Sequence, residues 1–141
     1  MPRLADVKFI RLGYFIGGIY DIILGLGITL VPNLLISILK IEKPNIMIFV
    51  YTNGLFLLIV GYYLLYACFH DVNNYLFIGF GSSMVRFAFA IVIILLWITE
   101  GIELPYLLIA ITDSITGLMI LIPIISAKGF TRKELWINDK S

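Results

Sequence analysis

Four long runs of apolar residues, separated by short polar segments, dominate the chain. These runs cover residues 12–32, 46–69, 75–98 and 104–125. A helix needs roughly 20 apolar residues to cross a hydrocarbon core of about 30 Å. Inside lipid the backbone must satisfy its own hydrogen bonds, so each run is predicted to be a helix and each polar segment a connection outside the core. The pattern therefore predicts an all-α, four-helix transmembrane bundle with short loops, formed by residues 1–141 as a single domain.

The composition supports this interpretation. Of the 141 residues, 61% are hydrophobic and 13% are charged, whereas a soluble domain carries about 25% charged residues. The net charge of +1 lacks the basic excess that is typical of nucleic-acid binding. We therefore expect an integral membrane protein that has membrane lipid as a partner and does not bind nucleic acid.

Lysine and arginine residues outside the apolar runs predict the orientation, because such residues favour the cytoplasmic side of a membrane. The first connector holds Lys40 and Lys43, and the third holds only Glu100 and Glu103. The other basic residues precede the first run or follow the last: Arg3, Lys8, Arg11, Lys128, Arg132, Lys133 and Lys140. Both termini are therefore predicted to be cytoplasmic.

Two segments beside the runs have the pattern of short interfacial helices. After Pro32, the polar residues Asn33, Ser37 and Lys40 recur at helical spacing among aliphatic residues, which is typical of a helix at the membrane surface. In the tail, Thr131 and Glu134 have the spacing of a capping box for a second short helix. An ordered loop is the alternative for both segments.

Small and polar residues form stripes along the predicted helices. Helices in lipid associate where small residues allow close approach, and residues four apart share a helix face. The stripes, in chain order, are Gly13, Gly17, Asp21, Gly25 and Thr29; Asn53, Leu57 and Gly61; Gly79, Ser82, Ser83, Arg86 and Ala90; and Ala110, Asp113 and Gly117. Each charge within a run lies on such a stripe, so it is predicted to face the interior of the bundle.

The three charges also lie at a similar depth. At 1.5 Å per residue, Asp21 and Asp113 lie about 14 Å along their runs and Arg86 about 16 Å along its run. A lone charge there costs roughly 2.5 to 3.5 kcal/mol, and the planar guanidinium of arginine can bind one or both carboxylates. We therefore predict that Arg86 pairs with Asp21 and Asp113. Two acids and one base leave an excess negative charge, which a proton or a bound cation would neutralise.

The sequence leaves two roles open for this cluster. It is either an ion pair that fixes how the helices pack or the polar part of a ligand-binding or proton-coupling site. Four further residues are candidates for the same cavity, although hydrogen bonding between helices is an alternative role for each. These residues are Asn53, Tyr62, Thr112 and Ser114.

The cysteine and histidine content limits the chemistry of a single chain. Cys68 and His70 are the only residues of their types, so one chain has no set of ligands for a structural metal or for a haem held by two histidines. Motifs for nucleotide binding, serine hydrolases and zinc proteases are also missing. We therefore assign no catalytic residue and no cofactor, and a protein that is not an enzyme is the favoured interpretation.

One segment resembles a known group of proteins. The string GLFLLIVGYYLLYACFHD, from Gly54 to Asp71, is followed by a glycine-containing run with a central basic residue. This arrangement, with Pro32 after the first run and Asp113 in the fourth, resembles small bacterial four-helix membrane proteins of the DoxX-like set. It departs from them at Arg86, where lysine is expected. The resemblance implies a bacterial or archaeal cell membrane and an association with redox or quinone complexes.

Several functions remain open at this point. The favoured one is an integral membrane protein whose Asp21–Arg86–Asp113 site binds a small or lipid-like ligand or supports a larger membrane complex. The alternatives are a small proton-coupled transporter that works as a homodimer, an accessory subunit of a membrane oxidoreductase that uses a quinone or lipid, and a purely structural subunit.

Overall fold

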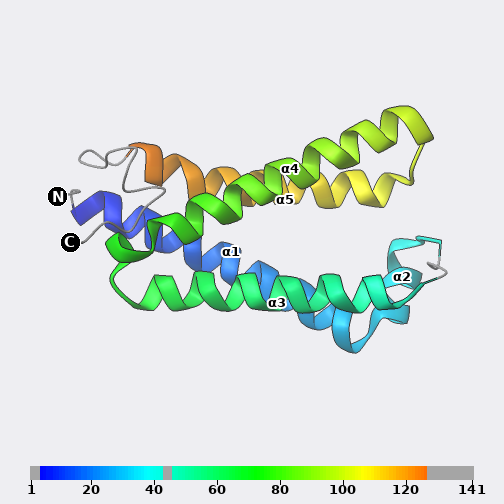
Figure 1. Cartoon of the computed structure of the whole chain (residues 1–141), viewed down its shortest axis with the longest axis horizontal. Helices are drawn as coiled ribbons and strands as arrows, with labels where there is room; N and C mark the ends of the chain where they lie inside the picture. The colour runs from blue at the N-terminus through cyan, green and yellow to red at the C-terminus, as the bar shows by residue number, and fades with distance from the viewer. Residues whose placement is uncertain (1–3, 43–45, 127–141) are drawn as a thin grey trace.

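The computed structural model describes residues 4–42 and 46–126, and helices make up nearly all of this part of the chain (Figure 1). The helices are α1 (Leu4–Leu30), α2 (Pro32–Leu39), α3 (Ile48–Phe69), α4 (Leu76–Glu100) and α5 (Leu104–Ser126), with a short 3-10 turn, η1 (Val72–Tyr75). All of them except α2 and η1 are long and apolar enough to span a membrane. The predicted all-α architecture with four spanning helices is confirmed, and the chain is an integral membrane protein.

The predicted runs and the observed helices differ mainly at the start of the chain. The first run begins at Leu12, whereas α1 begins at Leu4 and its apolar part at Val7. Apolar length marks only the part of a helix that lies in lipid, so polar turns at the start of α1 escape this pattern. The α1 helix ends at Leu30, before Pro32, because proline disfavours helical geometry in the residue that precedes it.

The short helix predicted after Pro32 is present as α2. Pro32 occupies its first turn, where the missing N–H group has no helical partner to lose. The helix ends at Leu39, and the next residue, Lys40, has a left-handed backbone (φ 53°) and donates its N–H group to the carbonyl oxygens of Ile36 and Ser37. The second predicted helix, with Thr131 and Glu134, lies outside the described residues.

Two pairs of helices form the bundle, and glycine sets the spacing within the first pair. In the α1–α3 pair, a Cβ atom added to Gly25 would lie 2.8 Å from the carbonyl oxygen of Gly54, and one added to Gly61 would lie 2.9 Å from that of Gly18. The two backbones are therefore in direct contact. Of the predicted stripe on α3, Gly61 lies against α1, whereas Asn53 is exposed and the neighbouring Gly54 makes the contact with α1.

The α1–α3 pair and the α4–α5 pair meet at one end and separate toward the other (Figure 1). We call the first the terminal end, where α1 begins and α5 ends, and the second the α2 end. Near the terminal end, Gly13 lies against the backbone of Met119 on α5, and the buried Tyr14 hydroxyl donates a hydrogen bond of 3.1 Å to the carbonyl oxygen of Tyr75. Between the pairs, α3 and α4 have little contact.

At the α2 end, a hydrogen-bonded contact between described residues connects the two pairs. The backbone N–H of Glu42, which follows α2, donates to both carboxylate oxygens of Glu103, at 3.2 and 3.3 Å. Glu103 precedes α5, so this exposed contact links the loop after α2 with the loop between α4 and α5. The prediction that both termini are cytoplasmic would put the α2 end on the opposite side of the membrane, and this orientation stays a prediction.

Gly61→Leu is expected to destabilise the protein, because the added side chain would push α3 away from Gly18 and from Cβ of Asp21, which lies 3.0 Å from the added Cβ position. Overpacking of this kind costs about 1–3 kcal/mol of unfolding free energy. Gly81→Leu is the matched control, because a Cβ atom there would have no neighbour within 4 Å. Titration with a denaturing detergent measures both stabilities, and equal values would contradict the close contact of α1 and α3.

Candidate functional site

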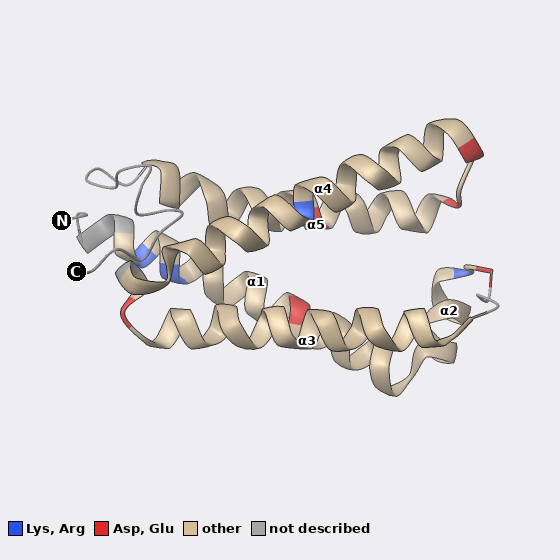
Figure 2. Cartoon of the chain, in the orientation of Figure 1, with Lys and Arg blue, Asp and Glu red and all other residues tan. Residues whose placement is uncertain are grey.

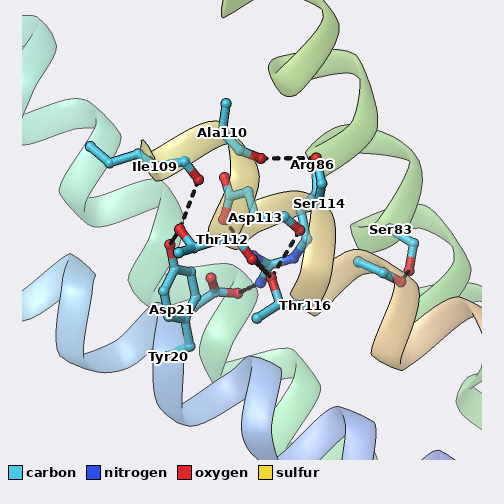
Figure 3. A network of polar contacts seen from close by, with 11 residues as sticks. Tyr20, Asp21, Ser83, Arg86, Ile109, Ala110, Thr112, Asp113, Ser114 and Thr116 are labelled. Atoms are coloured by element: carbon cyan, nitrogen blue, oxygen red, sulfur yellow. Dashed lines mark hydrogen bonds and ion pairs between the residues drawn. The ribbon is translucent and has the colours of Figure 1, made fainter. Parts of the chain in front are cut away.

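Arg86 forms two ion pairs with carboxylates from two other helices. Its Nη2 atom on α4 lies 2.6 Å from Oδ2 of Asp21 on α1, and its Nη1 atom lies 2.8 Å from Oδ1 of Asp113 on α5 (Figure 3). A flat guanidinium with a donor at each corner suits this bridge, whereas the single ammonium of lysine would not reach both acids in the same way. The predicted pairing of Arg86 with Asp21 and Asp113 is confirmed.

Two neighbouring side chains hold the arginine in place. Nη1 also donates to Oγ1 of Thr116 at 3.1 Å, and this hydroxyl in turn donates to backbone carbonyls of its own helix, including that of Asp113 at 2.9 Å. The guanidinium carbon lies 5.6 Å from the centre of the Tyr20 ring, which is within range for a cation–π contact. The arginine is therefore fixed by α5 on one side and by α1 on the other.

The cluster is buried and lies far from the other charges. Asp21 is 0% exposed, Arg86 5% and Asp113 8%. Figure 2 shows the remaining charged residues of the described chain at the two ends of the bundle and this group at mid-length. Close packing produces this burial, since Gly61 lies directly against Asp21 and Gly117 lies against Cβ of Arg86. The site holds one positive and two negative groups, so it carries an excess negative charge when all three ionise.

Three buried polar atoms at the site have no hydrogen-bond partner among the described residues. They are Oδ1 of Asp21, Nε of Arg86 and Oγ of Ser82. Leaving such an atom unpaired costs about 1–3 kcal/mol, and more for a charged group. All three residues are more than nine-tenths buried. The ion pairs therefore use only part of the hydrogen-bonding capacity of the site.

A cavity of about 780 Å³ lies beside these atoms, and Asp21, Ser82, Arg86 and Asp113 form part of its wall. We call it the central cavity. It extends from the ion pairs toward the α2 end, between the two helix pairs. Most of the wall is aliphatic or aromatic, with contributions from every helix: Leu24 and Ile28; Leu35, Ile36 and Leu39; Phe56, Leu57 and Tyr63; Val85 and Phe89; and Tyr106 and Ile109.

The structure brings together some of the other predicted site residues and separates the rest. Asn53 lines the central cavity. Tyr62 is 59% exposed and is not among the residues that line the cavity, whereas the adjacent Tyr63 is. Thr112 shares a hydrogen bond of 3.1 Å with Tyr20, and Ser114 donates to the carbonyl oxygen of Ala110 in its own helix. Neither Thr112 nor Ser114 is part of the wall.

The sequence reasoning did not identify Tyr20, Thr116 or Ser82 as part of the site. For Thr116 and Ser82 the sequence spacing could have predicted this, because residues three or four apart on a helix are neighbours. Thr116 follows Asp113 by three residues, and Ser82 precedes Arg86 by four. Tyr20 has no such spacing, since it is adjacent to Asp21 in sequence and reaches the arginine through its long ring. Among the described residues, no three histidine, cysteine or acidic side chains gather in a way that suits a metal ion.

Arg86→Met is expected to destabilise the protein, because it leaves Asp21 and Asp113 buried without a counter-charge. Breaking a buried ion pair in this way costs about 3–5 kcal/mol of unfolding free energy. The triple variant Asp21→Asn, Asp113→Asn and Arg86→Met has no charge left to bury, so it should recover most of the loss. Unfolding in denaturing detergent measures both variants. A single variant as stable as the parent protein would show that the ion pairs contribute nothing to folding.

Comparison of the chain with models of known protein families, with curated proteins and with solved structures finds no match. The resemblance to DoxX-like proteins therefore stays a prediction from the residues quoted for it. The structure itself establishes an integral membrane protein with a buried Asp–Arg–Asp network beside a largely apolar cavity.

Proposed function

We propose that this protein binds an amphiphilic, lipid-like ligand in the central cavity, with the polar head of the ligand at the Asp21–Arg86–Asp113 site. The observation that carries the proposal is the position of the three unpaired atoms. Oδ1 of Asp21, Nε of Arg86 and Oγ of Ser82 are all buried, and all belong to residues in the wall of one cavity. A ligand head at this place would supply the missing hydrogen bonds.

The size and the lining of the cavity support this proposal. Ligand pockets measure about 300–1,000 Å³ and combine an apolar wall with a few polar groups that orient the ligand, and the central cavity of about 780 Å³ has this character. Because the cavity lies between helices that span a membrane, a ligand can enter from the lipid phase. A molecule with an apolar body and one polar group matches both parts of the wall.

A purely structural role for the ion pairs accounts for less of what is observed. Polar networks that only hold a protein together are most favourable when every member is paired, because an unpaired buried group weakens the fold. Here Ser82 makes no hydrogen bond through its hydroxyl group, whereas the neighbouring Ser83 donates to the carbonyl oxygens of Gly79 and Gly117. The unpaired Ser82 is part of the cavity wall, whereas the paired Ser83 lies between α4 and α5.

Native mass spectrometry of the protein in a mild detergent tests whether a ligand is bound. The wild-type protein is expected to keep an additional mass from the membrane, and Gly81→Leu is expected to lose most of it, by about tenfold or more in occupancy. Gly81 lines the cavity and has open space beside it, so this variant should still fold. Ala88→Leu adds bulk to an exposed position on the same helix that is not in the wall, and it should keep the ligand. Equal occupancy in Gly81→Leu and Ala88→Leu would contradict the proposal.

Ser82→Ala separates ligand binding from stability. Because the Ser82 hydroxyl is buried and unpaired, removing it should leave the empty protein equally stable or stabilise it by up to about 1–3 kcal/mol, while the occupancy of the retained ligand falls. Ser114→Ala is the control, since Ser114 lies outside the wall and bonds within its own helix. Thermal unfolding of ligand-free protein and native mass spectrometry give the two readings. A Ser82→Ala variant that is strongly destabilised would show that the hydroxyl has a structural partner.

A further inference from the structure

We infer that the ligand carries a positively charged amine as its head, so that the site selects cationic amphiphiles over neutral and anionic ones. This inference rests on the proposed function and adds the chemical class of the ligand. Among the residues that line the central cavity, Asp21, Arg86 and Asp113 are the charged ones. One guanidinium stands against two carboxylates, so the wall has an excess of one negative charge when all three ionise.

No other basic group of the described chain offsets this charge. Lys8 and Arg11 belong to the terminal end and Lys40 to the α2 end, and none of them lines the cavity. The separation between the ends and the mid-length cluster is visible in Figure 2. Uncompensated charge is unfavourable in an apolar surrounding, where electrostatic interactions are stronger than in water. A ligand with a single positive charge removes the excess, whereas an anionic ligand doubles it.

The hydrogen bonds of Arg86 point to the same class of ligand. Anion sites offer several donors from arginine, usually as a pair of parallel N–H groups. Here Nη1 already binds Asp113 and Thr116, and Nη2 binds Asp21. The N–H of Nε and one of the two N–H groups of Nη2 therefore have no partner among the described residues. A phosphate or carboxylate head could reach these two donors only next to the carboxylates of Asp21 and Asp113, which repel it.

The acceptors at the site suit an ammonium group, which carries only donors. Oδ1 of Asp21 has no partner, and the side chain of Asp113 is the most exposed of the three, at 12%. Oγ of Ser82 is also unpaired and accepts hydrogen bonds as readily as it donates them. In Figure 3 the carboxylates of Asp21 and Asp113 lie on either side of the guanidinium. Because Asp113 keeps some exposure and lines the cavity, a primary amine head can approach its carboxylate without displacing Arg86.

The apolar part of the wall fixes where the body of the ligand lies. From the ion pairs the wall continues along Leu24 and Ile28 of α1 to Leu35 and Leu39 of α2. Because α2 folds back at this end, a chain with its head at mid-length would run parallel to the helices and end against α2. A phospholipid fits this arrangement less well, since its head adds a phosphate anion next to two carboxylates.

A competition between three amphiphiles of equal chain length tests the inference. Tetradecylamine, tetradecanol and tetradecanoate are mixed in equal amounts with the ligand-free protein in a mild detergent at neutral pH, where an alkylamine with a pKa near that of lysine, about 10.4, is protonated. The alcohol carries a deuterated chain, because its mass is otherwise nearly equal to that of the amine, and native mass spectrometry then measures the ratio of the three complexes. We expect tetradecylamine to exceed tetradecanol by about tenfold or more, and tetradecanoate to be retained least.

Removal of one negative charge from the site should abolish this preference. Asp113→Asn keeps an oxygen that can accept from Nη1 of Arg86 and leaves the site without excess charge, so the ratio of amine to alcohol should fall about tenfold. Asp71→Asn makes the same change in an exposed loop outside the wall and should leave the ratio unchanged. This control separates the charge of the site from the charge of the whole protein. If Asp113→Asn does not fold, Asp21→Asn replaces it. The ratio of amine to alcohol complexes in the wild-type protein tests the inference even without a variant.

The outcomes distinguish this inference from the proposed function. If all three amphiphiles are retained equally, or if tetradecanoate is retained best, the protein binds amphiphiles but does not select a cationic head, and the inference is wrong. If none is retained and no mass from the membrane accompanies the wild-type protein, the proposed function is wrong as well. A preference for the amine that persists in Asp113→Asn and in Asp21→Asn would place its origin outside this site and would also overturn the inference.

Discussion

The bridge from Arg86 to Asp21 and Asp113 is the interaction on which the arrangement of the helices depends. It connects α1, α4 and α5 through side chains that lie at mid-length and are almost fully buried. Charges at such a depth in a membrane are costly unless they are paired. Arrangements of these helices that separate the three residues are therefore disfavoured. The fourth spanning helix, α3, has no part in the bridge and is held through its glycine contacts with α1.

Glycine determines how the rest of the bundle accommodates this bridge. On α1, Gly18 and Gly25 bring the backbone of α3 into contact, and Gly13 does the same for α5 near the terminal end. At the other end of the bundle α3 and α4 have no comparable contact. The same chain is thus tightly packed where small residues face each other and open where they do not. The ion pairs lie at the boundary between these two regions, which explains why they are buried and still border a cavity.

The sequence predicts the helices and the ion pairs well because both follow from local patterns. Apolar runs define four spans, and small-residue stripes together with depth bring Asp21, Arg86 and Asp113 together. The choice between Tyr62 and Tyr63 could not be predicted, because adjacent residues on a helix point about 100° apart and the pattern there is apolar on every side. The cavity could not be predicted either. It depends on how far the two helix pairs separate, and that separation results from contacts between distant parts of the chain.

The contact between Glu42 and Glu103 is weaker than the ion pairs of Arg86, so the two ends of the cavity are not held together equally strongly. It is exposed and involves one backbone N–H group, so it contributes about 0.5–1.5 kcal/mol, or up to about 3 because the acceptor is charged, whereas breaking the buried bridge costs more. Low-energy contacts open first and most often. The loops that carry Glu42 and Glu103 are therefore expected to separate more readily than the helices at mid-length, where the bridge connects α1, α4 and α5.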